Sequence, residues 1–559
     1  MNASSAWWLG LAPGLALAWK GYRRLQLSWA KHPSLAGHSK WAGRVARLLP
    51  GYSFGEERFF DADGADAVLA SRRRAGFERL AGELARRHAR TVALTSEAAA
   101  HVSDMQFTKA YRVPFPFSRH VRERLRLGGF VDGSDGVTLR DLDGETFIDV
   151  TGSYGVNVMG HEFYKSCMEE AARRVAGMGV VLGSLHPCVA WNAAELCRIS
   201  GKDEVSFHMS GTEAVMQAVR LARYHTRRTH VVRFCGAYHG WWDDVQPGPG
   251  NPSRPGKVYT LKEMDAATLR VLGTRRDIAC VLVNPLQALH PNRPAPGDST
   301  LVDGTRRAGF DRGAYAAWLQ RLREVCTRRG IVLVFDEVFL GFRLAPGGAQ
   351  GYFGVQADLV TYGKTLGGGL PVGVVCGRRD LMRRFREDRP ADICFARGTF
   401  NSHPLVMASM QVFLERLQTP AVRALYEGLD ERWQGRARRM NERLRQEGHP
   451  VRVEAMSTVW TVLYDVASRY HWMLQFYLRA EGLALSWVGS GRMVFSLDFT
   501  DAQFDEVTER FARACRRMRD DGWWTAPPGL THRAIRRRLL VEMRTALLRR
   551  WAGNRPATH

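Results

Sequence analysis

Asp358–Gly369, with the sequence Asp-Leu-Val-Thr-Tyr-Gly-Lys-Thr-Leu-Gly-Gly-Gly, decides the fold of this chain. Within it, Lys364 stands between an apolar run and a run of glycines. Asp336 lies 28 residues upstream, at the end of the strand-like run Ile331–Phe335. A lysine amine that forms a Schiff base and a carboxylate that faces a pyridine nitrogen are the two protein groups that operate pyridoxal phosphate. The pair therefore predicts a site for that cofactor.

The chemistry of this pair supports the prediction. An ionised Asp336 would keep the pyridine nitrogen protonated, so that the ring accepts electrons from the substrate α-carbon. The glycines after Lys364 remove side chains where the backbone must pass close to a bound ligand. Alone, a lysine beside glycines is more often part of a solvated loop, so the prediction depends on further motifs in the right order.

The motif Ser-Gly-Thr-Glu-Ala at 210–214 precedes apolar residues at helical spacing. Small residues at a helix start leave backbone N–H groups free, and the helix dipole favours negative charge there. Ser210, Gly211 and Thr212 are therefore predicted to hold the cofactor phosphate. The alternative is an ordinary helix N-cap with Glu213 in the first turn.

Two further motifs suit the same cofactor. Gly-Ala-Tyr-His-Gly at 236–240 flanks Tyr238 with glycines, and a flat aromatic side chain can stack on a pyridine ring. Arg-Gly-Thr-Phe-Asn-Ser-His-Pro at 397–404 offers the Thr399 hydroxyl and backbone donors for a phosphate. In isolation the first would be a turn with a buried tyrosine and the second a polar loop.

In their order along the chain, these motifs resemble those of the class III aminotransferases, most closely glutamate-1-semialdehyde 2,1-aminomutase. Phe-Asp-Glu-Val-Phe-Leu-Gly-Phe-Arg at 335–343 and Thr-Gly-Ser-Tyr-Gly at 151–155 belong to the same pattern. The resemblance extends from about Gly76 to Arg517. It implies an α/β fold, the pyridoxal phosphate-dependent aminotransferase fold, with a large cofactor domain built on a parallel or mixed sheet and a smaller α+β domain.

The resemblance also implies roles for individual residues. Lys364 would form the Schiff base and transfer the proton, and Asp336 would pair with the pyridine nitrogen. Tyr238 would stack on one face of the ring and Val338 would touch the other.

Other positions concern the phosphate and the substrate. Gly211 and Thr212 would bind the phosphate through backbone groups. Thr399 would reach the phosphate of the neighbouring subunit, because this family builds its active sites across a homodimer. Tyr154 stands near the substrate, where the aminomutases usually have tryptophan.

The departures from the family pattern concern the substrate pocket. Asn284-Pro285 stands where the family usually has Glu-Pro, so a neutral amide replaces a carboxylate. Val113–Phe117 replaces the segment that helps to seat the substrate in aminomutases. Arg112 and Arg119 could bind a carboxylate, but in so basic a chain an arginine is more often solvated, and neither is included in the predicted site. These differences favour retained cofactor chemistry with an altered substrate.

Length and composition agree with this architecture. A chain of 559 residues with 45% apolar residues can hold two or three domains and a large core. Short apolar runs such as Val281–Val283, followed by helical patterns, indicate parallel strands with covering helices. We expect a basic, Trp-rich extension, a segment that packs on the small domain, the large cofactor domain, the small domain and a basic amphipathic tail. Their predicted bounds are 1–74, 75–149, 150–411, 412–520 and 521–559.

The nine cysteines are scattered along the chain. They include no CxxC pair and no His/Cys cluster with zinc spacing, so no metal site is predicted. A reduced, cytoplasmic protein is the simplest account of this cysteine usage. No stretch reaches the length of a membrane-spanning helix.

Positive charge is concentrated at the two ends. Residues 1–55 contain seven Lys and Arg and no acid, and residues 531–559 contain eight Arg and one acid, Glu542. Each segment thus carries a net charge of +7, and the two together supply +14 of the formal +24. The catalytic body is only mildly basic.

Aromatic and apolar residues accompany this charge. Near the N-terminus, the side chains typical of a membrane interface are Trp7, Trp8, Trp19, Tyr22 and Trp29. Near the C-terminus, the apolar residues that recur every four positions, as in a basic amphipathic helix, are Ile535, Leu539, Met543, Leu547 and Trp551.

Three interpretations of these ends remain open. In one interpretation, the ends bind an anionic surface. This surface is either a membrane, with the protein peripheral at the inner membrane surface, or an acidic partner such as an acyl carrier protein. The alternative is that both ends pack against each other or within the dimer. Nucleic acid is not favoured, because no recognised binding motif accompanies the charge.

Three functions are compatible with the sequence. In the first, an aminotransferase moves an amino group between an amino donor and an aldehyde or ketone, fatty or carrier-linked substrates included, and Lys364 shuttles the proton between the substrate carbon and the cofactor C4′ carbon. In the second, an aminomutase shifts the amino group within one molecule. The motifs favour the second, whereas Asn284 and Tyr154 favour the first. The third, a non-catalytic scaffold, disagrees with the intact Lys364 and Asp336.

Overall fold

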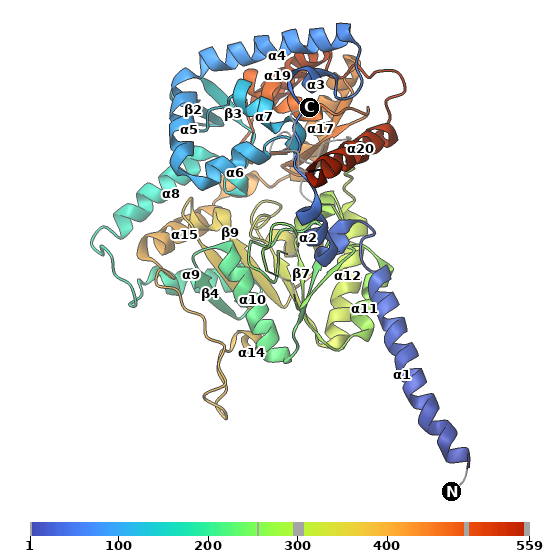
Figure 1. The fold of residues 1–559 in the computed structure, drawn as a ribbon. Coiled ribbons are helices and arrows are strands. Elements are labelled where there is room, and N and C mark those ends of the chain that lie inside the picture. Colours follow the sequence, from blue (N-terminus) through green and yellow to red (C-terminus); the bar gives the residue numbers. More distant parts are fainter. Residues whose placement is uncertain (1–2, 247, 254–255, 294–306, 486–490, 553–559) are drawn as a thin grey trace.

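The computed structural model describes residues 3–246, 248–253, 256–293, 307–485 and 491–552. Figure 1 shows a lower part built around one large sheet, an upper part rich in helices, and a long N-terminal helix that extends away from both. The lower part contains the predicted cofactor residues. The domain boundaries drawn from the sequence stay a prediction.

The large sheet has seven strands in the order β4-β10-β9-β8-β7-β5-β6. All neighbouring strands are parallel except β10, which is antiparallel to both β4 and β9. The strand bounds are β4 (Glu204–His208), β5 (His230–Phe234), β6 (Val258–Leu261), β7 (Ile278–Val283), β8 (Val332–Asp336), β9 (Leu359–Gly363) and β10 (Gly373–Gly377).

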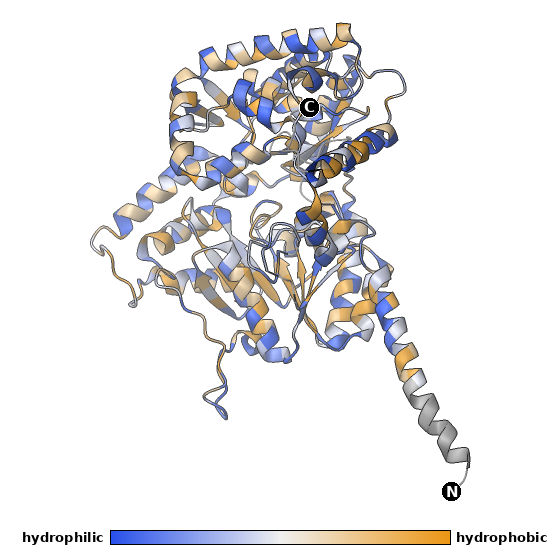
Figure 2. Ribbon diagram, viewed as in Figure 1, coloured by the Kyte–Doolittle hydropathy of each residue, from blue (hydrophilic) through white to orange (hydrophobic). Residues whose placement is uncertain are grey.

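The sequence of the central strands explains why they are covered on both faces. Every residue of β7, Ile-Ala-Cys-Val-Leu-Val, is buried, as expected for a parallel sheet between two helix layers. Cys280 and Leu282 pack with α10 (Gly211–Thr226) on one face. Val281 and Val283 belong to the core on the other face, with α12 (Arg312–Arg329). Figure 2 shows these strands as mostly hydrophobic.

The upper part contains two smaller sheets. One has the order β1-β2-β3-β13 and the other the order β11-β12-β14. The pairing of β3 with β13 joins residues before 150 to residues beyond 480 in one sheet. The strand bounds are β1 (Val131–Asp135), β2 (Thr138–Asp141), β3 (Thr146–Asp149), β11 (Val451–Met456), β12 (Val459–Tyr464), β13 (Leu483–Ala484) and β14 (Arg492–Val494).

Helices complete both parts. In the upper part they are α3 (Glu56–Asp61), α4 (Ala67–Arg87), α5 (Ala89–His101), α6 (Ser103–Tyr111), α7 (Phe115–Arg124), α17 (Leu429–Gln446), α18 (Leu474–Ala480) and α19 (Asp501–Asp520). The others around the large sheet are α8 (His161–Arg174), α9 (Cys188–Ser200), α11 (Ala266–Thr274), α13 (Gly348–Phe353), α14 (Arg379–Met382), α15 (Pro404–Leu417) and α16 (Pro420–Ala424).

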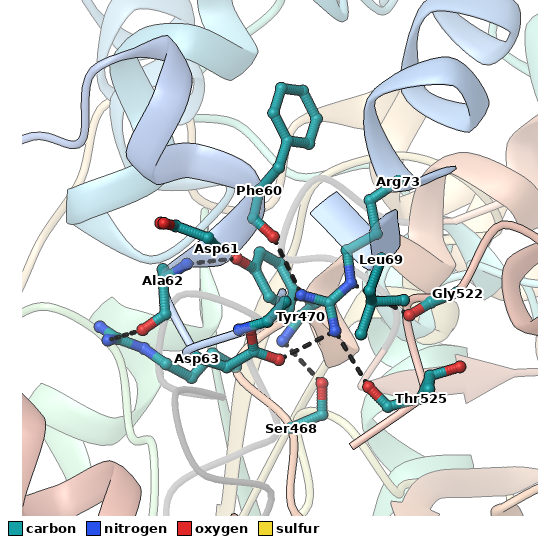
Figure 3. A network of polar contacts seen from close by, with 12 residues as sticks. Phe60, Asp61, Ala62, Asp63, Leu69, Arg73, Ser468, Tyr470, Gly522 and Thr525 are labelled. Atoms are coloured by element: carbon teal, nitrogen blue, oxygen red, sulfur yellow. Dashed lines mark hydrogen bonds and ion pairs between the residues drawn. The ribbon is translucent and has the colours of Figure 1, made fainter. Parts of the chain in front are cut away.

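A buried polar network ties the N-terminal helices to the end of the upper part (Figure 3). Arg73 makes two hydrogen bonds to Asp63, at 2.8 and 2.9 Å, and donates to the carbonyls of Phe60, Gly522 and Thr525 at 3.0 Å. A guanidinium has five N–H donors, and all five are used here. Because Arg73 and Asp63 are both fully buried, this pair holds α4 in one position on the C-terminal segment.

The N-terminal helix α1 (Ala3–Trp29) touches the body near its C-terminal end. Arg23 donates to the Thr274 carbonyl at 3.0 Å, and the Ala30 carbonyl accepts from Lys262 N at 2.7 Å. The exposed apolar side chains of its described portion are Leu15, Leu17, Trp19, Tyr22, Leu25 and Trp29. Within the described part of the chain, no helix combines the length and apolarity that crossing a membrane requires.

The C-terminal helix α20 (His532–Trp551) is attached to the body along one face. Ile535 is buried and Met543 packs against the core. Glu542 accepts a hydrogen bond from the Tyr52 hydroxyl at 2.8 Å and pairs with the fully buried Arg469 at 2.7 Å. Part of the apolar stripe expected from the sequence therefore faces the protein. For that face of α20, the structure favours packing against the protein body and not exposure to solvent or a membrane.

Candidate active site

Lys364 and Asp336 come from neighbouring parallel strands. Asp336 ends β8 and lies opposite Thr361 of β9, and Lys364 follows the last residue of β9. Lys364 has a φ of 43°, a left-handed conformation that L residues rarely adopt. Such strain is typical of functional positions, where the surrounding fold holds the backbone in place.

Asp336 is a buried carboxylate with three donors. It accepts from His239 Nδ1 at 2.7 Å, from Val338 N at 3.2 Å and from the Thr361 hydroxyl at 3.3 Å. Burial lowers the pKa of His239, against the opposing effect of the Asp336 charge, so the ring is neutral near pH 7. Since a carboxylate only accepts, the proton of that neutral ring must be on Nδ1.

The Lys364 amine lies in a largely desolvated setting. Burial lowers its pKa, the Asp336 charge opposes this shift, and Arg343 and Arg492 add to it. The Phe339 ring centroid lies 5.9 Å from Lys364 Nζ. A lysine with a lowered pKa is more often neutral and can act as a nucleophile or a base at ordinary pH.

The N-terminus of α10 adjoins this pair. A Cβ on Gly211 would lie 2.5 Å from Val338 Cγ1, and a Cβ on Gly240 would lie 2.5 Å from Thr212 Oγ1. These approaches place the first turn of α10 against the segment that follows Asp336 and against the turn after Tyr238. Ser210 is the N-cap, and its hydroxyl accepts from Glu213 N at 3.2 Å. The amides of Gly211 and Thr212 remain available to an anion.

Tyr238 and Asn284 are joined to each other. The Asn284 side-chain amide donates to the Tyr238 carbonyl at 2.9 Å, and its oxygen accepts from Leu286 N at 3.2 Å. The Tyr238 side chain is 61% exposed. Burial and then the Asp336 charge raise its pKa. Asn284 braces the backbone of the predicted stacking residue, and its role toward the substrate stays a prediction.

Tyr154 belongs to a strained turn at the edge of the site. Ser153 and Tyr154 have φ values of 45° and 58°, both left-handed. A Cβ on Gly155 would lie 2.6 Å from the Phe339 ring, so the turn packs against the aromatic side chain that faces Lys364. Tyr154, which is half exposed, belongs to this same turn, and its role toward the substrate stays a prediction.

Arg343 locks this turn and was not predicted. Its fully buried guanidinium donates to the carbonyls of Phe495 at 2.7 Å, Asn157 at 3.0 Å and Gly155 at 3.3 Å. It thereby connects the large sheet to the upper part. In the sequence, Arg343 stood out only as the last residue of the motif at 335–343. His239 likewise stood out only as part of the motif at 236–240.

Thr399 lies apart from this cluster. It is exposed on the segment between α14 and α15, and none of the hydrogen bonds among the described residues joins it to Lys364 or Asp336. Its predicted role in a neighbouring subunit's site therefore stays a prediction. Among the described residues, no group of His, Cys, Asp and Glu side chains could hold a metal ion.

The cluster fits pyridoxal phosphate. The Lys364 amine suits the aldehyde, the Asp336 carboxylate suits the pyridine nitrogen, and the first turn of α10 suits the phosphate. Gly211 also leaves room where a side chain would collide with Val338, beside the end of β8. In open α/β sheets, ligands bind beyond the carboxyl ends of parallel strands, which is where these residues meet.

Comparison with known proteins agrees with this assignment. The family described as aminotransferase class III matches residues 121–245 and 305–515. A glutamate-1-semialdehyde 2,1-aminomutase of Nitratidesulfovibrio vulgaris (strain DP4) is 34% identical over 345 residues, which are 60% of this chain and 77% of that protein.

Solved structures share the fold. A transaminase with pyridoxal phosphate bound aligns with a TM-score of 0.60 at 25% identity, over 76% of this chain and 97% of that one. A glutamate-1-semialdehyde aminomutase from Pseudomonas aeruginosa PAO1 aligns with a TM-score of 0.64 at 19% identity, over 80% and 99% of the two chains. The second likeness concerns the fold alone.

Proposed function

The chain belongs to the class III aminotransferases and is a pyridoxal phosphate-dependent enzyme; we propose that it transfers an amino group between an amino donor and an aldehyde or ketone. The observation that carries this proposal is the convergence of Lys364, Asp336 and the first turn of α10 at one edge of the large sheet. When bound, the cofactor supplies an aldehyde that takes up the amino group and an electron-accepting ring.

Each of these residues has a distinct task in the proposal. Asp336, oriented by His239, keeps the ring nitrogen protonated. Lys364 holds the cofactor through Nζ and, as a free amine, moves the proton from the substrate α-carbon. Tyr238 covers one face of the ring and Val338 the other. The backbone amides of the α10 first turn bind the phosphate.

The visible absorption spectrum of the purified protein with pyridoxal phosphate tests this proposal. We expect a visible band that Lys364→Ala abolishes, because the band requires attachment of the cofactor to Nζ. The control is Lys165→Ala, which removes an exposed lysine paired with Glu162 and should leave the band unchanged. A band that persists in Lys364→Ala would refute the assignment of Lys364.

Titration of the loaded protein with a panel of amino donors then separates the two candidate reactions. In a transaminase, one donor bleaches the band and leaves a keto product in solution. An aminomutase of the glutamate-1-semialdehyde type returns no keto product, because the amino group stays in the substrate carbon chain. The 34% identity to a protein named as such an aminomutase favours this second reaction, whereas Asn284 and Tyr154 favour the first.

We propose that the active enzyme is a homodimer. Exposed apolar side chains on the segments around the large sheet support this, since such residues are typical of an interface. They are Val180, Leu185, Trp241, Phe395 and Phe400.

Subunit mixing tests whether Thr399 serves the neighbouring site. Lys364→Ala and Thr399→Val subunits, each poorly active alone, would form a mixed dimer with one intact site if Thr399 acts across the interface. Recovery of activity on mixing is the expected result. If mixing recovers nothing although mixed dimers form, Thr399 does not act in the neighbouring site.

The N-terminus supports a peripheral attachment to an anionic membrane. The described portion of α1 exposes apolar side chains beside Lys20, Arg23 and Arg24, and α2 (Ser39–Leu48) exposes Trp41 and Leu48. Aromatic residues next to basic ones suit the interface of an anionic bilayer.

Cosedimentation with vesicles tests the attachment. Full-length protein should sediment with phosphatidylserine-containing vesicles and not with pure phosphatidylcholine, and a chain that begins at Ala30, which keeps α2, should bind the vesicles much more weakly. Helix α20 is left intact, because Glu542 secures it to the body. Equal binding by the truncated chain would contradict membrane attachment through α1, and binding to acyl carrier protein instead would identify the acidic partner.

A further inference from the structure

A cavity of about 720 Å³ lies between α5, α6, α7 and the loop that follows α7. Its volume is in the range of small-molecule sites in proteins. Seven of its 17 lining residues precede residue 121, where the match to the class III family begins, and the other ten lie within the first matched segment. In Figure 1 these three helices lie together in the upper part. Tyr154 also lines the cavity, so the cavity reaches the turn that packs against Phe339 at the active site.

The lining combines cationic and apolar side chains. The cations are Lys109, Arg112, Arg119, Arg122 and Arg126, and the apolar residues are Met105, Val121, Leu125, Leu127 and Phe130. Glu123 is the single carboxylate of the described lining, and it pairs with Arg119 at 3.2 Å. The cavity therefore has a marked excess of positive charge next to an apolar surface.

Lys109 and Arg126 are the cations in this cavity that carry the inference. Among the described residues, neither forms an ion pair with a carboxylate, and the Lys109 amine contacts only the Thr95 carbonyl, at 3.5 Å. Burial and then the charge of Arg126 lower the pKa of Lys109. Two cations that line one cavity, and that no carboxylate of the described residues pairs with, favour the binding of an anion there.

The part of the wall next to these cations is fixed in place. Gly129 N donates to the Thr95 hydroxyl at 2.9 Å, and that hydroxyl donates to the Thr91 carbonyl at 2.6 Å. A Cβ on Gly128 would lie 2.3 Å from Thr91 Cγ2, so the loop after α7 sits directly on α5. A wall that is held in this way is pre-organised, which reduces the entropic cost of binding a ligand.

Tyr154 connects the cavity to the reacting centre. Its neighbour Gly155 packs against the Phe339 ring, and that ring faces Lys364 Nζ at 5.9 Å. The cavity lining therefore reaches, at Tyr154, the turn that packs on the ring beside Lys364.

We propose that this cavity, called the Lys109 cavity below, binds the distal end of the substrate, an anionic group carried on an apolar chain, while the reacting carbon lies at Lys364. The proposal rests on the proposed aminotransferase function and narrows its substrate to an amphiphilic acid. Lys109 and Arg126 bind the acidic group, and the apolar wall contacts the chain. A carboxylate and a phosphate would both satisfy these cations.

Calorimetric titration of the cofactor-loaded protein tests the proposal with three probes: octanoate, octyl phosphate and octanol. We expect the two anions to bind at least about tenfold more tightly than the alcohol, and the tighter anion identifies the acidic group. The double variant Lys109→Gln/Arg126→Gln should weaken the binding of both anions about tenfold or more and leave octanol unchanged. The matched control is Arg124→Gln, because Arg124 is exposed, pairs with Glu78 at 2.7 Å and lies outside the cavity lining.

The visible cofactor band separates failure of this inference from failure of the proposed function. If the band forms in wild type and in the double variant, yet both bind the anions equally or neither binds them, the Lys109 cavity is not an anion site and the inference is overturned. If wild type forms no band, the proposed function fails, whereas selective binding of the anions would still assign the cavity. Weaker anion binding in Arg124→Gln equal to that in the double variant would also overturn the inference, since it would reflect overall charge alone.

Discussion

Removing the ring of His239 tests how the site holds its central carboxylate. His239→Leu deletes the shortest of the three hydrogen bonds to Asp336, at 2.7 Å, and leaves the donors at 3.2 and 3.3 Å. A hydrogen bond to a charged group contributes about 1.5–3 kcal/mol, so the dissociation constant of the cofactor should rise about tenfold to a hundredfold. Loss of stability of the apoprotein should be of similar size, because Asp336 is buried.

His239→Asn is the matched control. An asparagine side-chain amide can place a donor near the position of Nδ1, so this variant should retain most of the cofactor affinity that His239→Leu loses. The assay is a titration of apoprotein with pyridoxal phosphate, followed by the visible band, together with a denaturant midpoint for each variant. The reasoning is refuted if the leucine and asparagine variants bind the cofactor equally well, since the hydrogen bond would then contribute nothing.

Three further predictions concern stability and the cofactor site. Arg73→Met should destabilise the protein by about 3–5 kcal/mol in denaturant titration, because it leaves a buried carboxylate unpaired, whereas the exposed control Arg74→Met should cost less than about 1 kcal/mol. Gly211→Ala should weaken cofactor binding by about 1–3 kcal/mol, measured from the visible band, because the new Cβ would lie 2.5 Å from Val338. Burial and then the charge of Arg384 lower the pKa of His208 from 6.5 to about 4, so the unfolded state binds the extra proton first. The free energy of unfolding of wild type should fall by about 3 kcal/mol as pH falls from 6.5 to about 4, and it should fall less in His208→Gln.

The parallel strands and the proximity of Lys364 to Asp336 could be predicted because their signals are local. Lys364 and Asp336 each follow a short apolar strand, and adjacent parallel strands bring their carboxyl ends to the same edge. The start of α10 at Gly211 was predictable for the same reason, since small residues stand there before a helical pattern, and its role toward a phosphate stays a prediction.

The supporting residues were missed because their roles depend on distant parts of the chain. Arg343 donates to carbonyls that lie more than 150 residues away in the sequence on either side. No residue near Arg343 in the sequence indicates those partners. His239 was visible beside Tyr238, but its hydrogen bond to Asp336 spans 97 residues. Both stabilise the site through buried polar contacts, which leave no periodic pattern in the sequence.

The C-terminal helix shows how one residue can change the meaning of a pattern. A stripe of apolar residues with many arginines predicts a surface helix equally well for a membrane and for the protein body. Glu542 decides between them for one face, because a carboxylate that pairs with the buried Arg469 fixes the helix orientation. In the sequence, Glu542 counted only as a single negative charge among eight arginines.

The same reasoning explains why the substrate was harder to predict than the cofactor. Arg112 and Arg119 were set aside as solvated, because the sequence does not place them near any particular group. In the structure both line the Lys109 cavity, whose wall comes from α5 and α6, from α7 and the loop after it, and from Tyr154. The cofactor residues each follow a short strand and are visible in the sequence as local motifs, whereas the cavity wall is assembled from segments that no single motif joins. Substrate specificity should therefore change with substitutions in α6 and α7 that leave the visible cofactor band intact.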